Sequence, residues 1–130
     1  MKETEVFSKL KSFSEPELQR EMLKHGKLIS ANKGDVLIKE GQALNFLPIV
    51  VSGSIRVYQQ KEDREILLYY VKPGQTCMMS LSSAFFNNMS AASGMAMEKT
   101  DILVLPAHLI ADWQLKYPSW NSYIISTFRS

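Results

Sequence analysis

The sequence predicts one mainly β domain, a sandwich or roll, with helices towards both ends of the chain. Three observations lead to this fold class. The 130 residues fit a single domain. The middle of the chain consists of short runs rich in β-branched and aromatic residues, separated by glycines as strands are by turns. Towards both ends, apolar residues recur instead at helical spacing.

An N-terminal helix is expected from about residue 14 to residue 25. Ser14 and Glu17 have the spacing of a capping box, in which the serine side chain accepts a bond from the backbone N–H three residues later and the glutamate carboxylate returns one. One buried face of this helix is then marked by Leu18, Met22 and Leu23.

Between about residues 28 and 105 the chain is expected to form the strands of the roll. The predicted strands are the runs at residues 36–38, 46–51, 54–58, 65–71 and 102–105. The polar stretch from Gln60 to Arg64 is predicted to be the exposed turn of a hairpin. Residues 75–96 break the strand pattern with serines, methionines and phenylalanines, and a short helix and a loop are expected there.

C-terminal helices are expected from about residue 107 to residue 130, with one on each side of Pro118. No glycine or other stop signal precedes Ser130, which indicates a truncated chain or a natural short form. The second helix has an apolar face that is wide for a terminal helix and predicts a homodimer contact. This face consists of Trp120, Tyr123, Ile124 and Phe128.

Composition excludes several classes of protein. The net charge of +2 is spread along the chain without a long basic run, so nucleic acid is not expected as a direct partner. Cys77 is the only cysteine, which excludes an internal disulfide framework and a four-cysteine iron–sulfur cluster and suits a reducing cytoplasm. The chain has neither a signal peptide nor an apolar stretch of about 20 residues, so it is expected to be soluble, without membrane contact.

Neither a metal site nor an enzymatic centre is visible in the sequence. The only histidines, His25 and His108, are too far apart in sequence for a clustered metal site, and no cofactor is expected. No serine–histidine arrangement or tuned pair of carboxylates is present, so the protein is not expected to be an enzyme. Haem ligation through His108 and redox sensing by Cys77 stay open as alternatives.

Three stretches carry a resemblance to a known family. They are residues 34–41 (GDVLIKEG), 46–58 (FLPIVVSGSIRVY) and 70–74 (YVKPG). Over about residues 14–130 the chain resembles the cyclic-nucleotide-binding-domain family. Within it, the aromatic C-terminal helix and the stretch from Cys77 to Ser82 look more like bacterial Crp/Fnr regulators than like kinase or channel modules.

The resemblance implies a double-stranded β-helix, or jelly roll, that senses a small molecule. A dimerisation helix would follow the roll, and then a helix-turn-helix domain that reads DNA. That last domain is absent from the 130 residues, so DNA would be contacted only through a part missing from this chain.

The charged residues that hold a cyclic nucleotide in this family have no counterpart here. A glutamate that holds the ribose would fall at about Met79, and an arginine that neutralises the phosphate would fall at about Ala92. No arginine occurs between Arg64 and Arg129. We therefore expect no ordinary cyclic AMP binding, but a remodelled pocket for a less charged ligand. Its expected lining is Met78, Met79, Ser80, Leu81, Ser82, Ser83, Ala92 and Ser93.

Two functional hypotheses follow from these residues. In the first, the roll senses an unknown small-molecule effector as part of a Crp/Fnr-type transcription regulator, and the helix from Trp120 passes the signal on. In the second, the roll is degenerate and acts as a structural or protein-interaction module, and the methionines simply fill its interior. A metal-dependent cupin-like enzyme shares the roll shape but lacks the histidines.

Overall fold

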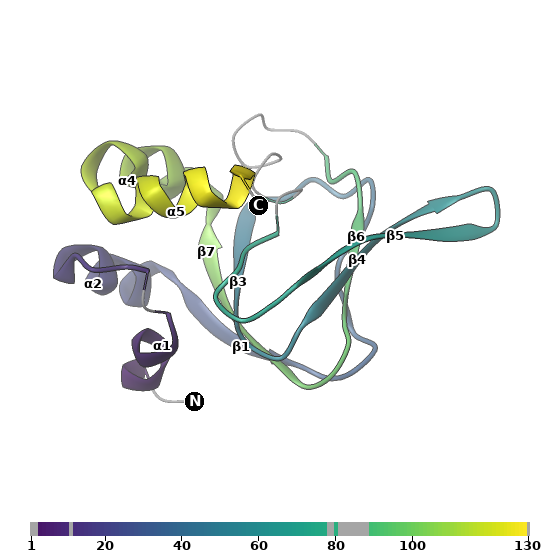
Figure 1. Cartoon of the computed structure of the whole chain (residues 1–130), viewed down its shortest axis with the longest axis horizontal. Coiled ribbons are helices and arrows are strands. Elements are labelled where there is room, and N and C mark those ends of the chain that lie inside the picture. Colours follow the sequence, from purple (N-terminus) through teal and green to yellow (C-terminus); the bar gives the residue numbers. More distant parts are fainter. Residues whose placement is uncertain (1–2, 11, 78–79, 81–88, 130) are drawn as a thin grey trace.

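The computed structural model describes residues 3–10, 12–77, 80 and 89–129 (Figure 1). Helices α1, α2, α4 and α5 lie on one side of a β-roll, from which the β4–β5 hairpin projects on the other side. The helical elements are α1 (Glu3–Lys9), α2 (Pro16–His25), the 3-10 helix η1 (Ala107–Leu109), α4 (Ile110–Lys116) and α5 (Pro118–Arg129). The strands are β1 (Lys27–Ala31), β2 (Val36–Ile38), β3 (Phe46–Ser52), β4 (Ile55–Lys61), β5 (Arg64–Val71), β6 (Ser93–Ala96) and β7 (Thr100–Pro106).

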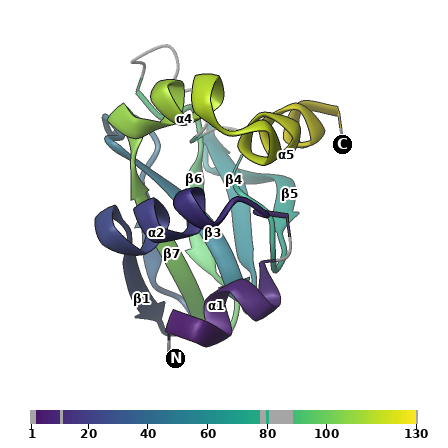
Figure 2. The ribbon, with the colours of Figure 1, turned by 90° about the vertical axis from the view of Figure 1, so that its left-hand side faces the viewer.

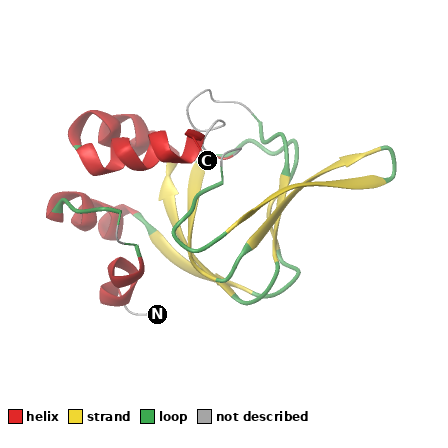
Figure 3. Cartoon of the chain, in the orientation of Figure 1, coloured by secondary structure: helices red, strands yellow, loops and turns green. Residues whose placement is uncertain are grey.

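The strands form two antiparallel sheets that face each other (Figure 3). One sheet has the order β1-β7-β3, and the other has the order β2-β6-β4-β5. The crossover order means that strands distant in the chain pair with each other, as β3 does with β7. The prediction of a mainly β roll with flanking helices is therefore confirmed.

Two apolar cores correspond to the two faces of the β1-β7-β3 sheet. The helix core lies between this sheet and the helices, which cover it in Figure 2. It contains an aromatic cluster in which the Trp120 ring stacks on Phe13 at 5.7 Å and meets Trp113 edge-on at 5.2 Å. The roll core lies between the two sheets and consists of Ala31, Ile38, Leu44, Val50, Ile55, Val57, Val71, Cys77, Ala92, Ala96 and Ile102.

The N-terminal region contains one helix more than the sequence predicted. Helix α1 is only seven residues long, too short to be stable alone, and tertiary packing holds it. The side chains of Val6 and Leu10 are buried in the helix core. Helix α2 occupies the segment where a helix from about residue 14 to residue 25 was expected.

The predicted capping box at the start of α2 is wrong. The N-cap residue is Glu15 rather than Ser14, and no side chain caps the helix. Pro16 at the first helical position needs no partner for a backbone N–H. The Glu15 carboxylate bonds instead to α5, where it accepts the Ser119 backbone N–H at 3.0 Å and the Ser119 hydroxyl.

The segment expected to be a short helix and a loop contains a strand. Strand β6 pairs with β2 on one side and β4 on the other, although its sequence SGMA has little strand propensity. Pairing on both sides overrides that propensity. At Gly94 an added Cβ would lie 3.3 Å from Ile55 and 3.7 Å from Ile38, so glycine fits the close approach to these core residues. The helical part of the prediction rests mainly on residues 78–79 and 81–88, which lie outside the described residues.

The hairpin turn predicted from polar residues is confirmed at the tip of β4 and β5. Lys61 pairs with Arg64, which leaves a two-residue turn. Both turn residues have positive φ, 47° at Glu62 and 66° at Asp63, as in a type I′ turn that matches the twist of a hairpin. None of the described helices is long and apolar enough to cross a membrane.

Candidate functional site

The residues expected to line a ligand pocket are only partly described by the structure. Met78, Met79, Leu81, Ser82 and Ser83 lie outside the described residues. The other three residues are buried: Ala92 belongs to the roll core, and Ser80 and Ser93 are buried polar residues.

The polar groups of these buried serines differ in their bonding. The Ser93 hydroxyl oxygen accepts the Glu40 backbone N–H at 2.9 Å, which joins β6 to the loop after β2. The Ser80 hydroxyl is fully buried and has no hydrogen-bond partner among the described residues. Ser80 therefore places an unsatisfied polar atom within the segment for which ligand contact was expected.

Cys77 lies at the edge of the roll core with its thiol buried. The Sγ atom is 3.3 Å from the Tyr69 hydroxyl, and the side chain is 2% exposed. Oxidants reach a buried thiol poorly, and reactive cysteines are partly exposed. This environment favours the interpretation of Cys77 as a packing residue over redox sensing.

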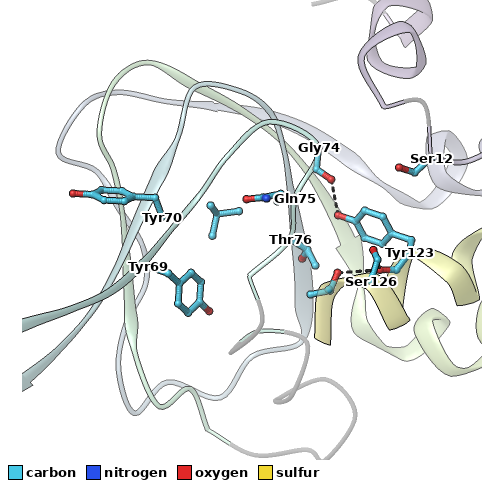
Figure 4. Close-up of a pocket in the computed structure, with 10 residues that line it drawn as sticks. Ser12, Tyr69, Tyr70, Gly74, Gln75, Thr76, Tyr123 and Ser126 are labelled. Carbon is cyan, nitrogen blue, oxygen red and sulfur yellow. Dashed lines mark hydrogen bonds between the residues drawn. The ribbon is translucent and has the colours of Figure 1, made fainter. Parts of the chain in front are cut away.

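A cleft opens between strand β5, the turn after it and helix α5 (Figure 4). Its volume is about 560 Å³, within the range of small-molecule sites. We call it the α5 cleft. It is lined by Ser12, Tyr69, Tyr70, Val71, Gly74, Gln75, Thr76, Tyr123, Ser126 and Thr127.

One hydrogen bond crosses the α5 cleft and joins the turn to the helix. The Tyr123 hydroxyl donates to the Gly74 carbonyl at 2.9 Å, as the dashed line in Figure 4 marks. Burial raises the pKa of the Tyr123 phenol, which keeps this donor protonated. Gly74 has φ +87°, a left-handed conformation that glycine adopts without strain. The turn that leads towards Cys77 is thereby tied to α5.

Several hydroxyl groups of the cleft, on α5 and at Thr76, donate to the backbone. Ser126 and Thr127 both donate to the Tyr123 carbonyl, at 2.9 Å and 3.0 Å, and Thr76 donates to the Pro48 carbonyl at 2.6 Å. Gln75 Oε1 accepts the Lys72 backbone N–H at 3.0 Å. The lining contains tyrosines, hydroxyl groups and one amide, and the described part of it contains no charged side chain.

Other depressions also lie among the described residues. A groove between α2 and the end of α4 is lined by side chains of both charges and by Tyr117. A smaller groove of about 200 Å³, lined by residues of β1, β2, β3 and β7, is almost entirely apolar and is bordered by Lys27. Among the described residues, no group of three or more histidine, cysteine or acidic side chains is placed to hold a metal ion.

A comparison with protein-family models decides the family. The model of the cyclic nucleotide-binding domain matches residues 28–115, about two thirds of the chain, which include both sheets and the start of the C-terminal helices. The chain belongs to the cyclic nucleotide-binding domain family. The jelly-roll fold expected from the resemblance is thereby confirmed. No curated protein sequence matches this cyclic nucleotide-binding domain.

Solved structures of the same fold include sensor domains of transcription regulators. The N-terminal domain of a transcriptional regulator from Streptomyces coelicolor A3(2) is 21% identical with a TM-score of 0.68, over 96% of this chain and 83% of that one. The sensor domain of the regulator DNR from Pseudomonas aeruginosa is 14% identical with a TM-score of 0.75, over 96% and 81%. Thermus thermophilus catabolite activator protein is 21% identical with a TM-score of 0.71, and this chain spans 56% of it.

In this cyclic nucleotide-binding domain, the apolar face expected to form a dimer packs inside the chain. Trp120, Tyr123 and Ile124 are buried in the helix core, and the side chain of Phe128 lies outside the described residues. Helical periodicity predicted that a second copy covers this face, and did not reveal that the helix core of the same chain covers Trp120, Tyr123 and Ile124. The cleft was missed because its lining comes from three separate segments, around Ser12, Tyr69 and Tyr123.

Proposed function

We propose that the chain is the effector-sensing domain of a Crp/Fnr-type transcription regulator and that it does not bind cyclic AMP in the usual way. The observation that carries the proposal is the α5 cleft, because its walls belong both to the turn preceding the candidate ligand segment and to α5. A ligand in this position would contact the turn that precedes the candidate ligand segment. It would also contact α5, the helix that would transmit the signal.

The Tyr123–Gly74 hydrogen bond gives this coupling a physical basis. An effector that moves the turn at Gly74 must stretch or break the bond, and an effector that strengthens it holds α5 against the roll. Ligand binding shifts a two-state equilibrium only through contacts that differ between the states, and this bond is such a contact. We propose two positions of α5, distinguished by the presence or absence of this bond.

Charge argues against a cyclic nucleotide as the effector. A cyclic phosphate needs a cationic partner or several N–H donors, and an arginine supplies two parallel bonds. Ala92, at the expected arginine position, is buried in the roll core. Residues 73–97 contain no lysine, arginine, histidine or acidic residue. A cyclic phosphate would find no charged partner in this segment.

The homodimer remains part of the proposal, with a different surface. Because Trp120, Tyr123 and Ile124 serve the helix core, a second copy would contact the opposite side of α5, where Ile125 is exposed. Contact with DNA would require a helix-turn-helix domain outside this chain, and a cytoplasmic location fits such a regulator.

A thermal-shift panel tests the proposal. Cyclic AMP, cyclic GMP and a set of neutral and redox-active metabolites are compared, because a ligand at one hundred times its Kd stabilises the native state by about 2.7 kcal/mol. The expected result is stabilisation by a neutral compound and none by the cyclic nucleotides. A clear shift with cyclic AMP would overturn our interpretation of Met79 and Ala92.

The rival function is a protein-interaction module without an effector. The filled roll core favours it, since apolar side chains occupy the space between the sheets. Ile66 and Leu67 on the projecting hairpin are exposed and offer a contact surface for a protein. This function would be favoured if no compound in the panel raised the melting temperature and if the chain captured a defined partner protein. Substitution of Ile66 and Leu67 should then abolish that capture.

A further inference from the structure

We propose that the α5 cleft binds a neutral heteroaromatic compound that donates a hydrogen bond through a ring N–H. This inference rests on the proposed function and names the ligand class of its site. It follows from three properties of the cleft: the absence of charge, the direction of its hydrogen bonds and its aromatic wall.

The first property is electrical neutrality. Among the described residues the lining has no acidic or basic side chain. Residues 73–97 contain no charged residue, and Lys72, which lies between Val71 and Gly74 in the chain, is exposed and is not part of the lining. A charged ligand would lose its hydration without gaining an ion pair, which is costly. The cleft therefore selects for neutral ligands.

The second property is that the hydroxyl groups on the α5 side of the cleft, those of Tyr123, Ser126 and Thr127, are already used as donors. The hydroxyl hydrogens of Tyr123 and Ser126 point to backbone carbonyls, at Gly74 and Tyr123 respectively. A hydroxyl has one hydrogen and two lone pairs, so each of these oxygens can still accept a bond. A ligand that donates an N–H matches these lone pairs, whereas an anionic ligand meets them with repulsion.

The third property is the wall opposite α5. Tyr69 and Tyr70 of β5 lie on that side, with the Tyr70 ring directed away from α5, and Gln75 and Thr76 lie between them and the helix (Figure 4). Aromatic rings pack well against tyrosine in offset or edge-on geometry. The side-chain oxygen of Gln75 accepts the Lys72 backbone N–H. The side-chain NH₂ group of Gln75 can therefore donate to a ring nitrogen of a ligand. A flat ring with one N–H and one acceptor nitrogen combines these requirements.

Calorimetric titration of the full chain with three matched probes tests the inference. Benzimidazole is neutral in mildly alkaline buffer and has a ring N–H and an acceptor nitrogen. The compound 1-methylbenzimidazole lacks the N–H, and benzimidazole-5-carboxylate adds a negative charge. We expect saturable binding of benzimidazole and binding of 1-methylbenzimidazole that is weaker by roughly two- to tenfold, the value of one hydrogen bond. The carboxylate should also bind more weakly than benzimidazole, because its charge loses hydration without gaining an ion pair.

Two substitutions on α5 locate the site. Ser126→Ala removes one accepting oxygen and should weaken benzimidazole by roughly two- to tenfold, while Ser122→Ala, on the exposed side of the same helix, should leave binding unchanged. Ser126→Trp places a large ring in the cleft and should abolish binding. Because Ser126 is exposed, both variants should keep the fold, which an unchanged far-UV circular dichroism spectrum and a cooperative urea transition would establish.

The outcomes separate this inference from the proposed function. No binding of benzimidazole, equal binding of the three probes, or full binding to Ser126→Trp overturns the ligand class. If another compound of the metabolite panel then stabilises the wild type but not Ser126→Trp, the α5 cleft is still the effector site, but its ligand is not a heteroaromatic N–H donor. If benzimidazole binds as expected but the amide hydrogen exchange of α5 does not change, the ligand class stands and the signalling role fails.

Discussion

Replacing Tyr123 by phenylalanine removes one hydroxyl group and leaves its ring in place. The ring packs against Phe13, with centroids 4.8 Å apart, and against Trp120, with centroids 5.8 Å apart, and both contacts remain. The change deletes only the bond to the Gly74 carbonyl. Since Gly74 is half-buried and water can reach part of it, we expect a loss of about 1 kcal/mol in the free energy of unfolding, and about 2 kcal/mol if the carbonyl stays dry.

Urea denaturation followed by tryptophan fluorescence measures this loss. Trp113 and Trp120, the only tryptophans, lie in the same aromatic cluster as Tyr123, so their emission reports on the helices. Tyr70→Phe is the matched control, because Tyr70 is exposed on β5 and its substitution should change stability by less than about 0.5 kcal/mol. Equal stabilities of the two variants would refute the view that the Tyr123 hydroxyl ties the turn to α5.

Two further substitutions test other contacts. Glu15→Gln should destabilise the neutral-pH protein by roughly 0.5–1 kcal/mol, because the carboxylate accepts two bonds from Ser119 near the N-terminus of α5. These bonds hold the pKa of Glu15 below its usual value, so the stabilisation is complete above the unfolded-state pKa and is lost as the pH falls through the folded-state pKa. Urea denaturation of the wild type and Glu15→Gln over a pH series should show that their free energies of unfolding become equal in acid. A difference that stays constant with pH would contradict the assignment of this stability to the Glu15 carboxylate. Gly53→Ala should lower the melting temperature far more than Gly34→Ala, since both glycines have positive φ but only at Gly53 would a Cβ collide with backbone, at 2.6 Å from the Lys99 carbonyl oxygen. Equal melting temperatures in a calorimetric scan would show that conformation alone matters at these turns.

Local sequence was sufficient for the strands whose composition matches their environment. The run from Ile49 to Val51 is β-branched throughout and is buried, so composition and structure agree. Strand β6 was missed because its stability comes from pairing with β2 and β4 rather than from its own residues. The Glu15–Ser119 contact was missed for a related reason: it joins residues 104 positions apart, and helix-start patterns describe only local bonds.

The candidate site shows the same limit. The amphipathic pattern of the last helix placed Tyr123 on its apolar face, but periodicity does not state whether the same chain or a second copy covers that face. The absence of arginine from residues 65–128 needed no structure, because composition alone supports it. The α5 cleft could not be predicted, since it depends on how three distant segments pack.

The helix core also determines the order in which the protein can be assembled during synthesis. Its members come from both ends of the chain, with Phe13 and Met22 on one side of the roll sequence and Trp113 and Trp120 on the other. A ribosome that has released the strands through β7 has therefore released α2 without the helices that bury it. Long-range contacts of this kind slow folding, because loop-closure entropy is lost before they form. The nascent chain accordingly carries an uncovered apolar surface until α5 has emerged and packed, and chaperones can bind that surface in the interval.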